Sequence, residues 1–139
     1  MALTLSGFSQ VDVNIRVKHF NVDKSLAIEG YDPVAYFILG KAVKGTSKIS
    51  YSFMGVIYNF SSDENKKKFI AQPEKYEPQY GGWCAYAMGN SGEKVEVDPE
   101  TFKIIDGKLY LFYNAFFNNT LLSWNKDEKN LKAKADKIG

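Results

Sequence analysis

The stretch Pro73–Met88 constrains the fold more than any other part of the chain. It contains two of the four prolines, two adjacent glycines, four aromatic residues and the only cysteine. Each proline holds φ at about −65° and removes a backbone donor, whereas Gly81 and Gly82 allow backbone conformations that other residues resist. We therefore expect a tight turn here, followed by a close approach of the backbone to another part of the protein.

The composition is typical of a single globular domain. The 139 residues are 45% hydrophobic and 15% aromatic, and a chain of this length buries roughly two-thirds of its unfolded surface. The net charge of +2 gives no field that would hold nucleic acid. No run of about 18 apolar residues is long enough to span a membrane. One cysteine excludes an internal disulfide, and one histidine excludes a metal site built from several histidines.

Residues 1–10 are first apolar and then small and polar, without any charge, which is typical of the last part of a secretory signal. A signal peptide should begin with basic residues, and none is present. Two interpretations stay open, an exported protein and a cytosolic protein with a frayed start. We predict a signal-peptide remnant or disordered start at 1–10 and a single domain at 11–139. On this interpretation the protein is exported and is periplasmic or envelope-associated.

Two β-hairpins are predicted from apolar and polar residues that alternate on both sides of a glycine-containing turn. The turns are Met54-Gly55 and Asp106-Gly107. Their strands are expected at residues 49–53 with 56–60, and at residues 102–105 with 109–113. The alternation at Val11–Val17 also predicts a strand or an extended arm.

The remaining pattern predicts two helices. Ser61 and Glu64 form a capping-box pattern for a middle helix that reaches about Ala71, where Pro73 stops it and leaves Phe69 and Ile70 to face the first hairpin. Asn114 is expected to cap a last helix. The apolar stripe of that helix consists of Phe117, Leu121, Trp124 and Leu131.

Three further segments complete the predicted fold. We expect a loop at 89–97, a turn at 98–100 and a frayed end at 132–139. The fold class is α+β: a small single domain with two antiparallel β-hairpins, a middle helix and a C-terminal helix. Asp32, Asp98 and Asp106 precede proline or glycine, where a side chain accepts from backbone amides two residues on. We interpret these three carboxylates as structural.

Four segments in the correct order resemble the YHS domain family, in its exported, stand-alone branch. They are residues 30–37 (GYDPVAYF), 58–76, 78–87 and 106–114. The resemblance implies a small YHS-like α+β module. YHS domains elsewhere accompany heavy-metal transporters and some oxygenases, so the resemblance also implies a metal-handling context, with copper as one such metal.

The metal-binding positions that the resemblance implies are not filled here. Relatives place cysteine at the positions of Ala35, Ser61 and Asn65, and histidine at the position of Asn59. Soft metals require thiolate, thioether or imidazole donors, which alanine, serine and asparagine lack. The usual metal site of the family is therefore absent from this sequence.

A different metal site is one interpretation of the sulfur atoms. Cys84 and Met88 are four residues apart, which places both on one face of a helix as a pair for Cu(I), with His19 or Met54 to complete it. The alternative is that Cys84 and Met88 are core residues. We expect no cofactor, with Cu or Zn as the alternative.

The aromatic residues around the two glycines predict a binding site. Tyr76, Tyr80, Trp83 and Tyr86 surround Gly81-Gly82, where a concave aromatic surface can hold a small ligand or a segment of an envelope protein partner. The alternative is that these rings pack as core, with Trp83 the most exposed. The function expected is a non-catalytic YHS-type binding module of the cell envelope. Its alternative is a small thiol-dependent enzyme that pairs Cys84 with His19, for which no orienting third group is evident.

Overall fold

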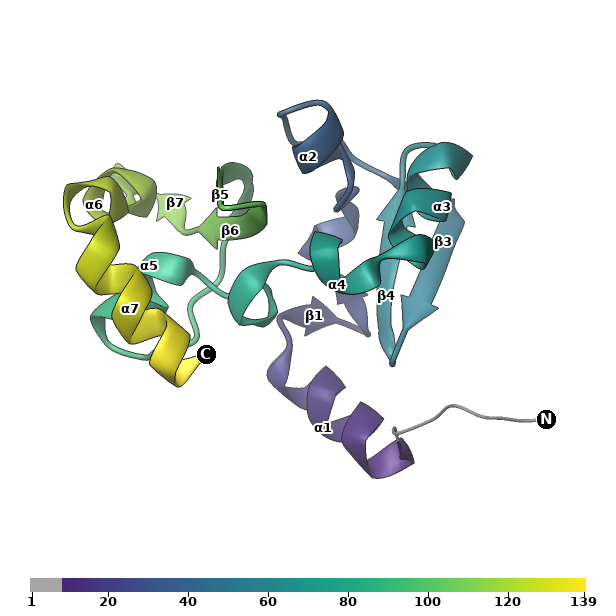
Figure 1. Ribbon diagram of the computed structural model, residues 1–139, viewed down its shortest axis with the longest axis horizontal. Helices are drawn as coiled ribbons and strands as arrows, with labels where there is room; N and C mark the ends of the chain where they lie inside the picture. Colours follow the sequence, from purple (N-terminus) through teal and green to yellow (C-terminus); the bar gives the residue numbers. More distant parts are fainter. Residues whose placement is uncertain (1–8) are drawn as a thin grey trace.

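A computed structural model describes residues 9–139 (Figure 1). The predicted signal remnant therefore lies outside the described residues, apart from Ser9 and Gln10, which begin the first helix. The first half of the chain contains the following elements: α1 (Gln10–His19), β1 (Val22–Asp23), β2 (Leu26–Ala27), a 3₁₀ turn (Ile28–Gly30), α2 (Ala35–Ile38), β3 (Thr46–Phe53), β4 (Val56–Phe60), α3 (Asp63–Ala71) and α4 (Pro73–Tyr76).

The first sheet has the strand order β1-β2-β4-β3, with β4 antiparallel to β3 and parallel to β2. The predicted hairpin is confirmed, because Met54 and Gly55 turn with φ values of 49° and 90°. Helix α3 covers this sheet through Phe69, which is fully buried. Its ring centroid lies 4.7 Å from that of Tyr58 and 5.3 Å from that of Phe60, so an aromatic cluster joins helix and sheet.

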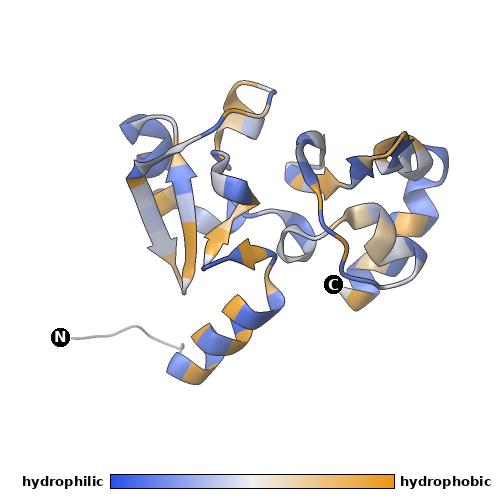
Figure 2. Ribbon diagram, turned by 180° about the vertical axis from the view of Figure 1, so that it is seen from behind, coloured by the Kyte–Doolittle hydropathy of each residue, from blue (hydrophilic) through white to orange (hydrophobic). Residues whose placement is uncertain are grey.

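The prediction of a strand or an extended arm at Val11–Val17 is wrong, because these residues form α1. The Ser9 hydroxyl accepts from Asp12 N at 3.1 Å, and the Asp12 carboxylate accepts from Ser9 N, so a capping box starts a helix. On a helix, alternating apolar residues divide between two faces, as the hydropathy colouring shows (Figure 2). Val13 and Val17 lie against the Gly55 turn, whereas Val11 and Ile15 are exposed.

Helix α1 is attached to the rest of the protein by a polar contact. Arg16 forms an ion pair with Glu77, and the Tyr58 hydroxyl donates to the same Glu77 oxygen at 2.6 Å. The Arg16 guanidinium also lies 4.3 Å from the centre of the Phe20 ring and 5.1 Å from that of Phe53. Because α1 has no fully buried residue, its orientation is set by Arg16 together with the partly buried Val13 and Val17.

The middle helix begins one residue later than predicted. Ser62 is the N-cap of α3 and accepts from Asn65 N at 3.1 Å, while Ser61 is bonded elsewhere. Pro73 does stop this helix, and it also begins α4. Of the two residues expected to face the hairpin, Phe69 does so, but Ile70 is exposed.

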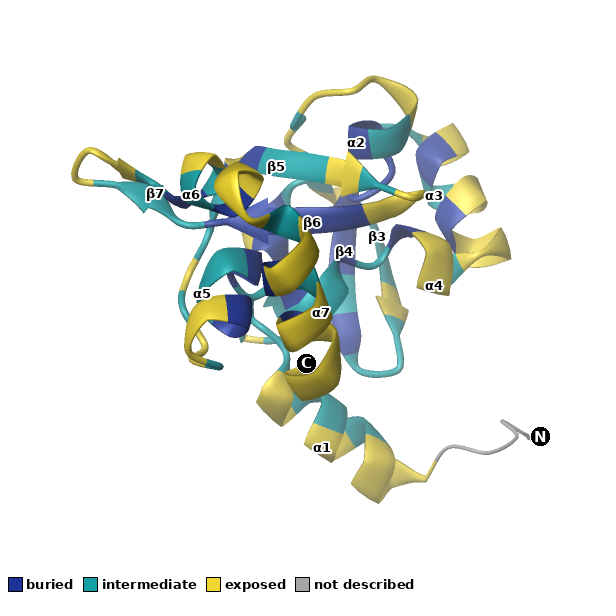
Figure 3. Cartoon of the chain, turned by 60° about the vertical axis from the view of Figure 1, so that its left-hand side comes forward, coloured by how far each residue is buried: buried dark blue, intermediate teal, exposed yellow. Residues whose placement is uncertain are grey.

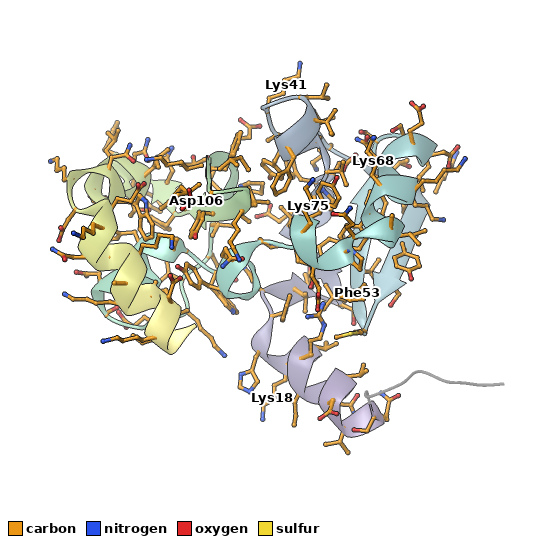
Figure 4. The ribbon with its side chains drawn as sticks, in the orientation of Figure 1. Lys18, Lys41, Phe53, Lys68, Lys75 and Asp106 are labelled. Atoms are coloured by element: carbon orange, nitrogen blue, oxygen red, sulfur yellow. The ribbon has the colours of Figure 1, made fainter. Side chains whose placement is uncertain are left out.

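Lysines are spread over the surface of the first half. Figure 4 labels Lys18 on α1, Lys41 after α2, Lys68 on α3 and Lys75 on α4. Lys18 and Lys41 lie at opposite ends of that view, so the labelled lysines form no single basic patch.

The second half continues from the 3₁₀ turn at Gln79–Gly82. Its elements are α5 (Ala85–Asn90), β5 (Asp98–Ile105), β6 (Lys108–Phe112), β7 (Asn114–Ala115), β8 (Asn118–Asn119), α6 (Thr120–Lys126) and α7 (Glu128–Ile138). The β5–β6 hairpin and its Asp106-Gly107 turn are confirmed. The turn expected at 98–100 is instead an irregular start of β5, and the loop predicted at 89–97 begins only after α5 ends.

Strand β6 connects two hydrophobic cores. Leu109 and Leu111 belong to the core of the first half, around Tyr58 and Phe69. The alternate residues Tyr110 and Phe112 belong to a second core with Trp124 and Leu131. Because successive side chains of a strand point to opposite faces, one strand serves both cores.

The C-terminal helix differs from its prediction. Asn114 starts the β7–β8 hairpin instead of a helix, and Phe117 is fully exposed at its tip. The helix begins at Thr120 with Asn119 as N-cap, and it breaks at Asp127 into α6 and α7. The end predicted to fray is helical to Ile138, because Ala135 is fully buried.

The fold class is confirmed as α+β, with two further short hairpins, β1–β2 and β7–β8, among residues 9–139. In the part of the chain that the structure describes, no helix is long and apolar enough to cross a membrane.

Candidate ligand-binding site

The doubled glycine brings two distant segments together, as expected. Gly81 and Gly82 have φ values of 62° and 87°, which other residues rarely adopt. Asn21 donates its backbone N–H to the Gly81 oxygen at 2.9 Å and its side-chain amide to the Gly82 oxygen at 3.1 Å. Phe20 also lies against Gly81. The end of α1 is thereby held beside Tyr80–Trp83.

A pocket of about 350 Å³ opens where these segments meet. We call it the aromatic pocket. It is lined by His19, Phe20, Tyr80, Gly81, Trp83, Met88, Gly92, Lys94, Ile138 and Gly139. Three of the six predicted ligand-binding residues, Tyr80, Gly81 and Trp83, line it, and so do His19 and Met88 from the predicted metal set.

The two largest rings of the aromatic pocket are fixed by their polar ends. The Trp83 indole N–H donates to the His19 carbonyl oxygen at 2.7 Å, and the Tyr80 hydroxyl donates to Asp136 Oδ1 at 2.7 Å. Burial and this hydrogen bond to Asp136 raise the pKa of Tyr80 far above its usual value. Tyr80 therefore stays a neutral phenol, and both rings keep one orientation.

Lys94 and His19 supply the polar groups at the mouth of this pocket. Lys94 Nζ lies 3.0 Å from His19 Nδ1, and both residues are exposed. An ammonium group can only donate, so Nδ1 accepts and the imidazole proton of this pair lies on Nε2. No carboxylate within residues 9–139 forms an ion pair with Lys94. Spare donors are thus available beside apolar rings.

The other predicted binding residues lie elsewhere. Tyr76 is buried in the first core, with its ring centroid 5.2 Å from that of Phe37. Gly82 is a buried residue of the 3₁₀ turn and does not line the aromatic pocket. Tyr86 lines a separate pocket of about 270 Å³, together with Cys84 and Thr120.

Cys84 is fully buried and its sulfur is already partnered. Sγ accepts from Tyr113 N at 3.3 Å and lies 3.5 Å from Thr120 Oγ1. The Thr120 hydroxyl itself donates to the Tyr113 oxygen at 2.6 Å, so the thiol is left to donate to Oγ1. Cys84 and His19 line different pockets, and the structure therefore does not bring the proposed thiol–imidazole pair together.

Met88 lies one turn after Cys84 on α5 and is almost fully buried at the floor of the aromatic pocket. Cys84 does not line that pocket, so Cys84, Met88 and His19 do not share one cavity. Between Ser9 and Gly139, no group of three or more His, Cys, Asp or Glu residues is placed to hold a metal ion.

A second gathering of polar groups lies in the first half, around the fully buried Asp32. Its Oδ1 accepts from Val34 N at 2.8 Å and Ala35 N at 3.2 Å. Its Oδ2 accepts from Ser61 N at 2.8 Å, Ser61 Oγ at 2.7 Å and Asn65 Nδ2 at 2.9 Å. We call Asp32, Ala35, Ser61 and Asn65 the Asp32 cluster. Both carboxylate oxygens are fully occupied by N–H and O–H donors.

Comparison with known families gives one match. The sequence model for the YHS domain matches residues 34–80. The resemblance to the YHS domain family is thereby supported over residues 34–80. No curated protein and no solved structure shows a significant match. The YHS match includes most of the Asp32 cluster but ends before Trp83, Met88 and Lys94, so most of the aromatic pocket lies beyond it.

The metal positions implied for YHS relatives fall on the Asp32 cluster. Ala35, Ser61 and Asn65 occupy three of the four positions, and each of them donates to Asp32. None has a sulfur or imidazole donor, and the carboxylate has no free acceptor site for a harder cation. The residues present therefore do not fit a metal at the place that the resemblance to YHS domains implies. A hydrogen-bonded carboxylate joins α2, β4 and α3 there instead.

Three residues that line the aromatic pocket were not predicted from the sequence. Phe20 follows a helix that was predicted as a strand, Lys94 lies in a loop with no distinguishing pattern, and Ile138 belongs to the end predicted to fray. None of these three residues carried a signal in the sequence. The aromatic content of Tyr80–Trp83 was the feature that identified the site.

Proposed function

We propose that the protein is a non-catalytic binding module whose aromatic pocket holds a small organic anion with an apolar ring. The observation that carries this proposal is the convergence of Phe20, Tyr80 and Trp83 with the unpaired ammonium of Lys94 on one pocket of about 350 Å³. Small-molecule sites are typically concave and apolar, with a few polar groups that fix orientation.

The polar groups decide the charge of the ligand. Lys94 and His19 offer N–H donors only, which pair with a carboxylate or a similar anion. Tyr80 and Trp83 use their own donors on Asp136 and His19, so they offer ring faces to the ligand. Cys84 takes no part because its sulfur is buried and hydrogen-bonded. Export to the envelope stays a prediction from residues 1–10.

Fluorescence titration tests this proposal directly. Trp83 lines the pocket, whereas Trp124 is fully buried in the second core, so a ligand in the pocket should alter only the emission of Trp83. Phenylacetate is a suitable probe, with 2-phenylethanol as the uncharged comparison. We expect a saturable change for phenylacetate that is lost in Trp83→Phe.

Two results would contradict the proposal. One is the absence of saturable phenylacetate binding, by fluorescence and by calorimetry. The other is equal affinity for 2-phenylethanol and phenylacetate, which would show that Lys94 does not recognise an anion.

A further inference from the structure

Four hairpins within residues 9–139 have two-residue turns with positive φ at both positions. The φ values are 51° and 72° at Lys24-Ser25, 49° and 90° at Met54-Gly55, 51° and 76° at Asp106-Gly107, and 52° and 63° at Phe116-Phe117. Such turns favour asparagine, aspartate and glycine, because a bulky side chain is strained at positive φ. Lys24-Ser25 and Phe116-Phe117 both lack glycine, but of the four turns only Phe116-Phe117 places a large aromatic residue at both strained positions.

The same two phenylalanines are the most exposed large apolar residues in the described chain. Phe116 is 90% and Phe117 is 110% exposed relative to a free reference residue. Figure 3 shows the β7–β8 hairpin projecting from the body with its tip exposed. Its base is fixed, because Asn114 donates to Thr101 Oγ1 at 3.0 Å and Thr120 N donates to the Tyr113 oxygen at 3.0 Å. A rigid base thus carries an apolar tip into solvent.

The surroundings of the tip carry no charge along the chain. From Leu109 to Asn125 there is no Asp, Glu, Lys or Arg. Asparagines flank the two rings, and the exposed Leu122 follows in the first turn of α6. Such a segment can enter a lipid interface without taking a charged side chain with it, which would be costly.

The size of the tip decides between a lipid surface and a second protein. Two phenylalanine rings bury about 300–500 Å² in all. A stable protein–protein interface needs about 800 Å² from each partner. A protruding tip of this size is too small for a flat interface between proteins, whereas insertion among lipid headgroups requires only a convex apolar point.

We propose that the Phe116-Phe117 tip inserts into the interfacial region of a lipid bilayer and binds the protein reversibly to a membrane surface. A single small apolar insertion supports weak, reversible attachment, not permanent anchoring. The aromatic pocket plays no part in this contact, because Phe116 and Phe117 do not line it.

The test is co-sedimentation of the whole protein with phosphatidylcholine vesicles, with and without phosphatidylglycerol. The variant F116N/F117G removes both rings and supplies the turn residues that the backbone conformation favours, so the hairpin itself is retained. We expect the wild type to bind and the variant to bind at least tenfold more weakly. The variant V11S/I15S is a matched control, because it removes two exposed apolar residues from α1 and should bind like the wild type.

Three outcomes would overturn the proposal. They are no sedimentation of the wild type, equal binding by F116N/F117G, and loss of binding in V11S/I15S alone. Sedimentation velocity adds a fourth: a dimer that dissociates in F116N/F117G would show that the tip contacts a second copy instead of lipid.

Discussion

The Asp32 cluster and the aromatic pocket both contain polar groups from distant parts of the chain. In the Asp32 cluster these groups are hydrogen-bonded to one another, whereas in the aromatic pocket some donors stay exposed to solvent. Asp32 is fully buried, and five donors occupy its two oxygens. Lys94 and His19 are exposed, and their side chains are hydrogen-bonded to each other. A buried and fully bonded group stabilises the fold, whereas an exposed donor beside apolar rings stays available for a ligand.

The two regions also differ in how they relate to the segment that resembles the YHS domain. The Asp32 cluster lies almost entirely in the part that matches the YHS domain, at the positions where relatives place metal ligands. The aromatic pocket is built mostly from residues after the match. Any binding activity of this chain is therefore expected to depend on residues that the YHS match does not include.

The largest expected effect is that of Asp32→Ala. The substitution leaves the buried donors at Val34, Ala35 and Asn65 without an acceptor, so the free energy of unfolding should fall by about 3–5 kcal/mol. Urea denaturation measures this change. Asp63→Ala, at an exposed position in the first turn of α3, is the control and should cost less than about 1 kcal/mol. A loss below about 1 kcal/mol for Asp32→Ala would refute a structural role.

A double-mutant cycle sharpens the assignment of the two serines. Ser61 donates to Asp32, whereas Ser62 caps α3, so Ser61→Ala should couple to Asp32→Ala by about 1–2 kcal/mol. Ser62→Ala should lower stability by about 1 kcal/mol, additively with the Asp32 change. Chemical denaturation of the single and double variants checks this. If Ser62 coupled to Asp32 and Ser61 did not, Ser61 would be the N-cap of α3.

Lys94→Gln, unlike the substitutions in the Asp32 cluster, should weaken ligand binding and leave the stability of the fold almost unchanged. Removal of the ammonium should weaken phenylacetate binding about fivefold, or roughly 1 kcal/mol. The free energy of unfolding should change by less than about 0.5 kcal/mol, as for most surface substitutions. Titration calorimetry and urea denaturation measure the two quantities. Lys126→Gln, on the exposed end of α6, is the matched control.

Metal ions should have the smallest effect. Because the Asp32 cluster has no soft donor, addition of Cu, Zn or EDTA should shift the Tm by less than about 1 °C, since a ligand stabilises only the fold that binds it. Scanning calorimetry and metal analysis of protein purified without chelators provide the measurement. Stoichiometric copper that is lost in Cys84→Ser would instead support the Cys84–Met88 pair as a metal site.

Local turn chemistry explains which parts of the fold could be predicted. Met54-Gly55 and Asp106-Gly107 identified two hairpins because glycine permits positive φ. Phe116-Phe117 carries no such signal, so part of the β7–β8 hairpin was predicted as helix. The period-two pattern of α1 is typical of a strand, and only the capping box at Ser9 and Asp12 pointed to a helix.

The candidate site was only partly predictable for a different reason. The bond from Val34 N to Asp32 is local and was expected, but the contacts of Asp32 with Ser61 and Asn65 span about thirty residues and follow from tertiary packing. Likewise, Tyr80 and Trp83 belong to one conspicuous segment, whereas Lys94 and Ile138 reach the pocket through the folding of the second half.

Strand β6 has a consequence for where this module begins and ends. Since Leu109 and Leu111 complete the core that Tyr58 and Phe69 begin, a fragment restricted to residues 34–80 lacks part of its own interior. The alternate residues Tyr110 and Phe112 tie the same strand to α6 and α7. The two halves should accordingly melt in one cooperative transition. The smallest unit that folds on its own is therefore expected to be much longer than the matched residues 34–80.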